Sequence, residues 1–222
     1  MNGDAEQSDD GGRDRSLGRM AYDALLDRLI RREIPVGSVL QERRLAEELD
    51  ISRTPVRDAL NRLESEGFVT RKPGRMLVVT EFSTRTLIET LYVRQVLEAD
   101  AVMLATDRIP QAALDASEAA IRAVMDMPVP DAEADWAADS LFHGMIAEHS
   151  DNAVLSKMIL DLRIKTHMFN LDRMPERFEA GHREHLAVIA ALRRRDREAA
   201  RDGIRAHIEN VKQSIIDKLR RI

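Results

Sequence analysis

The second half of the chain is a run of amphipathic segments separated by prolines, and this pattern constrains the fold more than any other feature. Apolar residues recur there at intervals of three and four, as they do on one face of a helix. Pro110, Pro128, Pro130 and Pro175 fall between the segments, where helices end or begin. No stretch of this half shows the polar–apolar alternation of a strand. We expect about six helices, at residues 83–106, 110–127, 132–149, 153–171, 175–194 and 196–221.

The composition agrees with a mainly helical chain. Of the 222 residues, 44% are hydrophobic but only 4% are aromatic, so the apolar positions are mostly Leu, Ile, Val, Ala and Met. Cys is absent, which excludes disulfides and thiolate metal sites and fits a cytoplasmic protein. No apolar run approaches the roughly 18–20 residues that span a bilayer, so no membrane location is expected. The polar, acidic residues 1–16 predict a disordered tail rather than a signal peptide or an anchor.

A different pattern precedes the helical half. Three helical segments are followed by two strand-like stretches that flank Lys72-Pro-Gly-Arg75, and Gly67 is placed to end the third helix. This is the order of a winged helix-turn-helix domain. The predicted elements occupy residues 17–32, 41–49, 52–66, 68–71 and 76–80. We therefore expect a winged domain at 17–80, a junction at Glu81–Phe82, and an all-helical domain at 83–222.

The third helix of the winged domain carries the residue types that read DNA. Ser52, Arg53, Thr54 and Arg57 lie at its N-terminal end, where arginines reach base edges and free backbone N–H groups favour phosphate. The whole chain has a net charge of −5, but residues 17–80 are slightly basic. Taken singly, an arginine on a helix face is more often plain solvated surface. The ordered combination of elements favours double-stranded DNA as the partner.

Other residues of the same domain extend this prediction. Gly74 allows the tip of the hairpin to approach DNA closely, and Arg75 beside it can enter a minor groove. Arg43 on the second helix can clamp the backbone.

These residues resemble the GntR family of bacterial transcription regulators. The resemblance rests on the runs Glu42-Arg-Arg-Leu-Ala-Glu47, Ser52-Arg-Thr-Pro-Val-Arg-Asp-Ala-Leu60 and Leu63-Glu-Ser-Glu-Gly-Phe-Val69. It implies that Arg43, Arg53, Arg57 and Gly74 with its neighbours touch operator DNA. One departure is Arg44, which stands where the family usually has an acid.

The resemblance continues past the junction. Leu91-Tyr-Val-Arg-Gln-Val-Leu-Glu98, Asp139-x-x-Phe-His143 and the two C-terminal segments look like the FCD ligand-binding domain of FadR-type members of this family. About six helices favour the shorter, VanR-like variant of that domain. The resemblance covers nearly the whole chain from Leu17.

Asp139, His143, His185 and His207 predict a metal site in the helical domain. Asp139 and His143 are four residues apart and share a helix face, and the two other histidines lie in separate apolar segments. A helical core rejects unpaired Asp and His. For any one histidine a satisfied structural role is the commoner explanation, but all four residues match the family's positions. The other histidines, His149, His167 and His182, do not match, and we expect them at the surface or at a pocket rim. Such a set suits Zn²⁺, Ni²⁺, Mn²⁺ or Fe²⁺ without choosing among them.

A metal held by four protein groups leaves coordination positions for a ligand's oxygens, so we expect a small carboxylate effector. The resemblance implies that Arg94 binds this effector; the alternative is an ordinary ion pair with Glu98, four residues on.

Three functions remain open from the sequence. The leading one is a ligand-responsive regulator, a homodimer on a palindromic operator, most simply a repressor that the effector releases. The second is a metal-dependent helical enzyme, which is disfavoured because no general base or nucleophile accompanies the four ligands. In the third, the metal itself is the signal or is purely structural.

Overall fold

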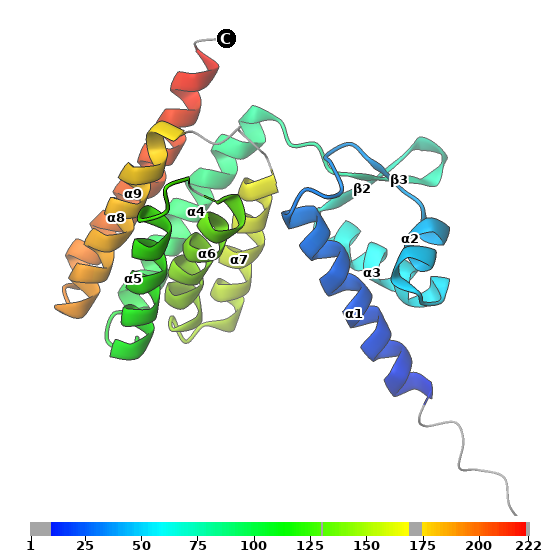
Figure 1. Cartoon of the computed structure of the whole chain (residues 1–222), viewed down its shortest axis with the longest axis horizontal. Helices are drawn as coiled ribbons and strands as arrows, with labels where there is room; N and C mark the ends of the chain where they lie inside the picture. The colour runs from blue at the N-terminus through cyan, green and yellow to red at the C-terminus, as the bar shows by residue number, and fades with distance from the viewer. Residues whose placement is uncertain (1–9, 130, 169–174, 221–222) are drawn as a thin grey trace, which may run out of the picture. The chain divides into compact units, whose positions relative to one another are not determined.

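The computed structural model describes residues 10–129, 131–168 and 175–220. The chain divides into two compact units, Met1–Phe82 and Ser83–Ile222. Both units are drawn in Figure 1, coloured from blue at the N-terminus to red at the C-terminus.

The first unit combines three helices with a small sheet. The strands pair antiparallel in the order β1-β3-β2, with Val39 opposite Val78 and Val69 opposite Val79. The elements are α1 (Asp10–Ile30), β1 (Val39–Leu40), α2 (Glu42–Leu49), α3 (Arg53–Ser65), β2 (Val69–Lys72), the short 3-10 helix η1 (Pro73–Arg75) and β3 (Met76–Val79). The winged helix-turn-helix order is confirmed.

The core of the first unit holds α3 firmly in place. α1 packs against α3, and Leu25, Leu60, Leu63 and Phe68 are almost fully buried between the helices and the sheet. Gly67 ends α3 with a φ of +82°, a left-handed conformation that favours glycine, and the Phe68 N–H donates to the carbonyl of Leu63. The buried face of α3 therefore leaves its N-terminal residues exposed to solvent.

Two expectations for this unit were wrong. Strand β1 was not predicted, because two residues are too few for alternation to be recognised, although Leu40 is buried and Val39 exposed as a strand requires. Helix α1 begins at Asp10, so residues 10–16 of the predicted disordered tail are helical. No proline interrupts them, and an acid at the first position favours the positive end of a helix. Residues 1–9 of that tail lie outside the described residues.

The second unit is an all-helical bundle, as predicted, with six helices among its described residues. α4 packs against α6, α7 and α9, α8 packs against α5 and α9, and α5 also contacts α6 (Figure 1). The helices are α4 (Thr84–Ala105), α5 (Gln111–Met125), α6 (Ala132–Glu148), α7 (Ala153–Met168), α8 (Pro175–Arg193) and α9 (Arg197–Leu219). Their bounds follow the predicted ones closely where both can be compared, and the predicted ends at residues 171 and 221 lie outside the described residues.

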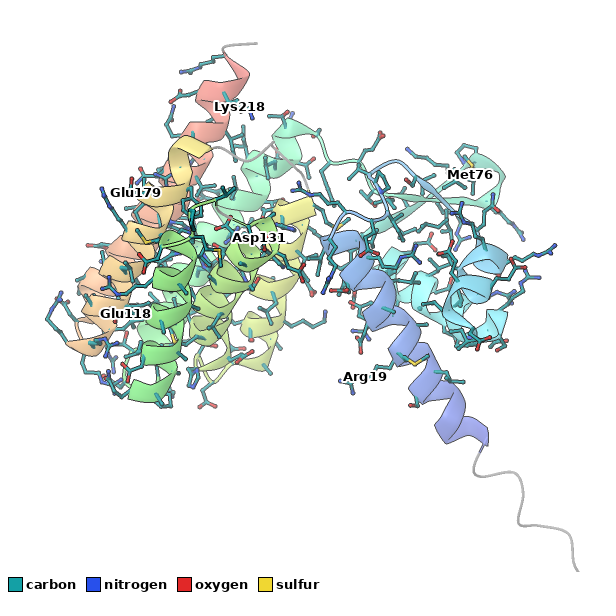
Figure 2. All side chains as sticks on the ribbon, viewed as in Figure 1. Arg19, Met76, Glu118, Asp131, Glu179 and Lys218 are labelled. Atoms are coloured by element: carbon teal, nitrogen blue, oxygen red, sulfur yellow. The ribbon has the colours of Figure 1, made fainter. Side chains whose placement is uncertain are left out.

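Polar side chains begin several of these helices. Ser83, Asp131 (labelled in Figure 2) and Asp196 accept hydrogen bonds from backbone N–H groups in the first turns of α4, α6 and α9. The interior is aliphatic and closely filled around Phe142, which is completely buried. None of the described helices is long and apolar enough to cross a membrane.

Candidate functional site

The bundle brings the four predicted metal ligands together. α6 supplies Asp139 and His143, α8 supplies His185 and α9 supplies His207, and one ligand atom from each lies within 4.8 Å of the others. Nε2 of His185 is 3.1 Å from Nε2 of His207. Oδ1 of Asp139 is 3.6 Å from Nε2 of His143 and 3.8 Å from Nε2 of His185. Four ligand atoms thus face one point between three helices.

His143 and His185 are buried, and their charged forms are disfavoured. Burial lowers the pKa of His185 well below its usual range, and the neighbouring His207 and His143 lower it further. Burial also lowers the pKa of His143, although Glu98 and Asp139 oppose this. At neutral pH both imidazoles therefore present a lone pair, as a metal ligand must.

Asp139 is charged in spite of its surroundings. Burial alone raises the pKa of this carboxyl, but the Arg163 guanidinium and the nearby His143 outweigh it and hold the pKa well below its usual value. Arg163 is 3% exposed and donates from Nη2 to Oδ2 of Asp139, which leaves Oδ1 facing the histidines. The site thus contains one carboxylate oxygen and three imidazole nitrogens.

Two carboxylates orient the imidazoles from behind. Nδ1 of His143 donates to Glu98, whose oxygen lies 2.5 Å away, and Nδ1 of His207 donates to Glu184 at 2.8 Å. Burial raises the pKa of Glu184, but hydrogen bonds from His207, Arg177 and Asn210 bring it down to about 2. A protonated Nδ1 leaves the Nε2 lone pair free on the side of the cluster.

The arrangement fits a divalent transition metal. Ligand distances of about 2.1 Å place neighbouring donors roughly 3–3.4 Å apart, and the spacings of 3.1, 3.6 and 3.8 Å here lie within or above that range, so a bound ion would draw the donors slightly together. The donor set of nitrogen and oxygen suits Zn²⁺, Ni²⁺, Mn²⁺ or Fe²⁺. A metal would be favoured most by His185 and His207, because their buried Nε2 atoms face each other and both could bind the same ion.

Several partners of this cluster were not predicted. Arg163 and Glu184 were not predicted, because each contacts a cluster residue on a different helix and neither belongs to a local sequence motif. His182 was expected at the surface or at a pocket rim, but it is buried beside His185 and its Nε2 lies 2.9 Å from Asp135. Glu98 was predicted only as an ion-pair partner of Arg94, because its contact with His143 joins α4 to α6.

Arg94 forms the ion pair with Glu98 that was given above as the alternative to effector binding. Its Nε donates to Glu98 at 2.8 Å, and its Nη1 donates to the hydroxyl of Thr166 at 2.9 Å. Arg94 therefore acts on the cluster through Glu98 and His143, and a direct contact with an effector stays a prediction.

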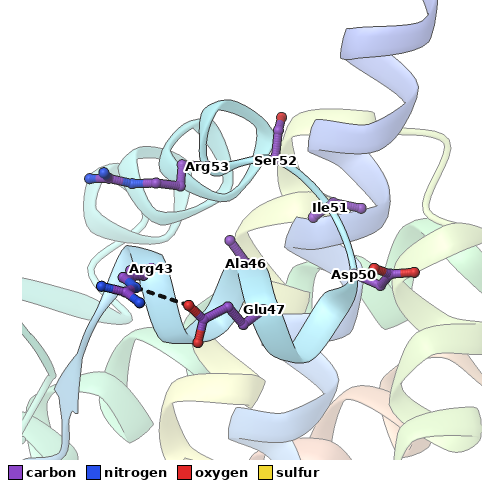
Figure 3. Close-up of a pocket in the computed structure, with 7 residues that line it drawn as sticks. All are labelled: Arg43, Ala46, Glu47, Asp50, Ile51, Ser52 and Arg53. Carbon is purple, nitrogen blue, oxygen red and sulfur yellow. Dashed lines mark hydrogen bonds and ion pairs between the residues drawn. The ribbon is translucent and has the colours of Figure 1, made fainter.

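In the first unit, the predicted DNA-contacting residues gather around the start of α3. Ser52 is the N-cap residue of α3, and Arg53, Thr54 and Arg57 are exposed on its first turns. A groove of about 470 Å³ separates this end of α3 from α2 (Figure 3). It is lined by Arg43, Ala46, Glu47, Asp50, Ile51, Ser52 and Arg53.

Acidic partners hold the arginines of this surface. Arg43 pairs with Glu47, while Arg53 and Arg57 both pair with Glu42 (the Arg43 contact is dashed in Figure 3). We refer to Ser52, Arg53, Thr54, Arg57 and Arg43 as the reading surface.

The wing tip lies in η1, at the turn between β2 and β3. Gly74 has a φ of +79° and no atom within 4 Å of the position of an added Cβ, and Arg75 beside it has a φ of +62°. Arg75 and Lys72 are exposed cations in this turn. The structure thus presents a basic, open hairpin tip.

Comparison with known families matches both units. The model of bacterial regulatory proteins of the gntR family matches residues 17–79, and the FCD domain model matches residues 89–210. Among curated relatives, the HTH-type transcriptional regulator McbR of Escherichia coli is 30% identical over 171 residues, covering 74% of this chain and 77% of McbR. The Nta operon transcriptional regulator of Aminobacter aminovorans is 27% identical over 192 residues, covering 83% and 87%.

Solved structures show the same fold. E. coli McbR/YncC superposes with a TM-score of 0.79 at 24% identity, covering 91% of this chain and 98% of the other. The metal-free FCD domain of TM0439 superposes with a TM-score of 0.55 at 21% identity, covering 64% of this chain and all of that domain.

Proposed function

The chain belongs to the GntR family of bacterial regulatory proteins and carries an FCD domain, and from this premise we propose that it is a metal-containing repressor that a small carboxylate releases from DNA. Its families and relatives are transcription regulators, so the helical enzyme considered above is set aside. We further propose that the bundle is the VanR-like form of a FadR-type domain and that the protein acts in the cytoplasm.

The metal site is supported by the convergence of Asp139, His143, His185 and His207 on one point. When bound, a divalent ion would supply a Lewis-acidic centre with coordination positions open to oxygen ligands. The protein's own contribution is orientation: Glu98 and Glu184 hold the protons of two imidazoles on Nδ1, and Arg163 fixes the carboxylate of Asp139.

A carboxylate effector fits the charges around this site. The acids nearest the cluster are already paired with cations: Glu98 with Arg94, Asp139 with Arg163, and Glu184 with Arg177. An added divalent ion therefore brings positive charge that a carboxylate can balance. We propose that Arg94 binds the effector. Its guanidinium group would then form a hydrogen bond with the effector carboxylate while it keeps its ion pair with Glu98.

DNA binding is assigned to the reading surface and to Gly74 and Arg75 of the wing. A homodimer would place two such surfaces on the half-sites of a palindromic operator. Exposed apolar side chains on α4 support dimerisation: Tyr92 is 60% exposed and Val96 52%. Val154 and Met158 of α7, which packs against α4, are exposed as well.

A second possibility is that the metal alone is the signal. The ion pair between Asp139 and Arg163 favours this possibility. Because Arg163 neutralises the carboxylate when no metal is bound, the protein can exist both with and without the metal, as a metal sensor must. In that case metal occupancy by itself would change DNA affinity.

The DNA-binding assignment is tested with Arg53→Ala and Arg57→Ala. A binding site is first selected with the wild-type protein from a library of random duplexes. We expect each variant to lose about 1–3 kcal/mol of specific binding energy, because an arginine to guanine contact is worth that much. Arg85→Ala, an exposed arginine of α4, is the control. Undiminished specific binding by both variants contradicts the assignment.

A further inference from the structure

We propose that Glu42, the first residue of α2, is a specificity-determining residue for operator recognition. Glu42 pairs with Arg53 and Arg57 of α3 when DNA is absent. A DNA sequence is therefore bound specifically only if it offers these arginines better hydrogen-bond acceptors than the Glu42 carboxylate. The inference goes beyond the proposed function and rests on DNA binding alone, which the family establishes.

The geometry joins one carboxylate to both arginines. Nη2 of Arg57 lies 3.1 Å and its Nε 3.3 Å from Oε2 of Glu42, and Nη2 of Arg53 lies 3.4 Å from the same oxygen. The Glu42 side chain is only 26% exposed, whereas those of Arg53 and Arg57 are 61% and 52% exposed. The Glu42 carboxylate is thus largely covered, and the guanidinium groups of Arg53 and Arg57 lie against it.

Glu42 is charged at neutral pH. The hydrogen bond from Arg57 lowers its pKa, with a smaller opposing effect from burial and further lowering by the charges of Arg57 and Arg53. When α3 meets DNA, the charges of Arg53 and Arg57 are therefore already partly neutralised by Glu42.

This pairing has a consequence for specificity. Phosphates occur at every step of a duplex, so an unpaired arginine binds any sequence. An arginine that must exchange a carboxylate for its new acceptor gains little from a single phosphate. It gains more from the two acceptors of guanine, O6 and N7, which match the guanidinium fork. The Glu42 carboxylate also repels phosphate, and it can itself accept a hydrogen bond from the amino group of cytosine.

The wing behaves differently. Within the part of the chain that the structure describes, Lys72 and Arg75 make no ion pair with an acid, so their charges are available to any phosphate. Attraction to DNA in general and selection among sequences thus belong to different parts of the domain. Lys72 and Arg75 provide the first, and Arg53 and Arg57 under the control of Glu42 provide the second.

The test compares the wild-type protein with Glu42→Gln. Affinity is measured by fluorescence anisotropy for two labelled duplexes, the site selected with wild-type protein and a scrambled duplex of equal length, over a series of salt concentrations. Glu48→Gln is the matched control, because it removes the same charge from the same helix but releases Arg44 and Arg28, which lie outside the reading surface.

We expect Glu42→Gln to bind the scrambled duplex several-fold more tightly and to lose about tenfold in the ratio of specific to non-specific affinity. Glu48→Gln should keep that ratio. A ratio in Glu42→Gln equal to or above that of the wild type overturns the proposal. So does equal weakening on both duplexes, which indicates a purely structural role.

Circular dichroism and the melting temperature establish that the variants are folded. If Glu42→Gln does not fold, Glu42→Asp is measured instead, because it keeps the charge but withdraws it from the arginines. It should lower the same ratio by a smaller factor, and an unchanged ratio there overturns the proposal as well.

Discussion

His185 is the residue on which the metal site depends most directly. Its Nε2 faces His207 and Asp139, and its Nδ1 is buried without a hydrogen-bond partner among the described residues. Its low pKa keeps it neutral, so without a metal it is a buried polar group that is poorly satisfied. A metal in the cluster would bind the Nε2 lone pair of His185, the atom that faces His207 and Asp139.

His185→Ala should therefore abolish metal binding. Removing one of four protein ligands is expected to weaken affinity for Zn²⁺ by at least about 100-fold, because even the loss of an outer partner costs 10–100-fold. Metal content after dialysis against a metal buffer measures this. His149→Ala is the control, since His149 hydrogen-bonds to the carbonyl of Met145 and lies outside the cluster. Equal metal content in both variants contradicts the site.

Part of this site could be predicted from single residues. Asp139 and His143 follow from helical spacing, and the resemblance to the family added His185 and His207. Their partners could not be predicted, because Glu184 meets His207, and Arg163 meets Asp139, only after separate helices have packed. His182 was misjudged for the same reason: its burial depends on which face of α8 turns inward.

Among the elements, the contact between α8 and α9 controls the spacing of the two histidines they carry. Gly203 of α9 lies where a Cβ would come within 2.8 Å of a methyl group of Val188 on α8. Gly203 is one turn before His207, and Val188 is three residues after His185. The closeness of these two helices therefore brings the Nε2 atoms of the histidines within 3.1 Å.

Gly203→Ala should separate α8 and α9 locally. We expect a loss of stability of about 1–3 kcal/mol, as for an overpacked core, together with weaker metal binding. Thermal unfolding and metal titration measure the two effects. Gly144→Ala is the matched control, because an added Cβ there meets no atom within 4 Å. Unchanged metal affinity in Gly203→Ala would show that the site does not depend on this contact.

Helices were easier to predict than strands in this chain. Where the predicted ends of α4 to α9 fall on described residues, prolines and apolar spacing place them within a few residues, and Gly67 marks the end of α3. Strand β1 escaped because its two residues gain their structure from pairing with β3, which is distant in the sequence. Helix α1 escaped at its start because polarity alone does not distinguish an exposed helix from a disordered tail.

At the scale of the whole molecule, the proposed operator binding requires two copies of the chain. The exposed apolar residues of α4 and α7 are the candidates for their interface, because Tyr92 and Val96 are four residues apart and share one face of α4. Specific binding to a palindromic site requires both reading surfaces at once.

Val96→Lys should therefore dissociate the dimer. A charge at the centre of an apolar interface has no partner there, so the monomer should dominate at micromolar concentration. Analytical ultracentrifugation gives the mass, and affinity for the selected duplex should fall in parallel. Val129→Lys adds the same charge at an 80% exposed position outside α4 and α7 and should remain dimeric. A dimer of Val96→Lys would place the interface elsewhere.

Control of DNA binding by a metal-bound carboxylate can be tested in one titration. Operator affinity is measured for protein treated with chelator, then reloaded with Zn²⁺, Ni²⁺, Mn²⁺ or Fe²⁺, and then given short mono- and dicarboxylates. We expect the metal alone to leave operator affinity nearly unchanged. A carboxylate should weaken it about tenfold or more only in the metal-loaded protein, a typical coupling between two sites. A full change of affinity on adding metal alone, or an equal response to carboxylates without metal, would contradict it.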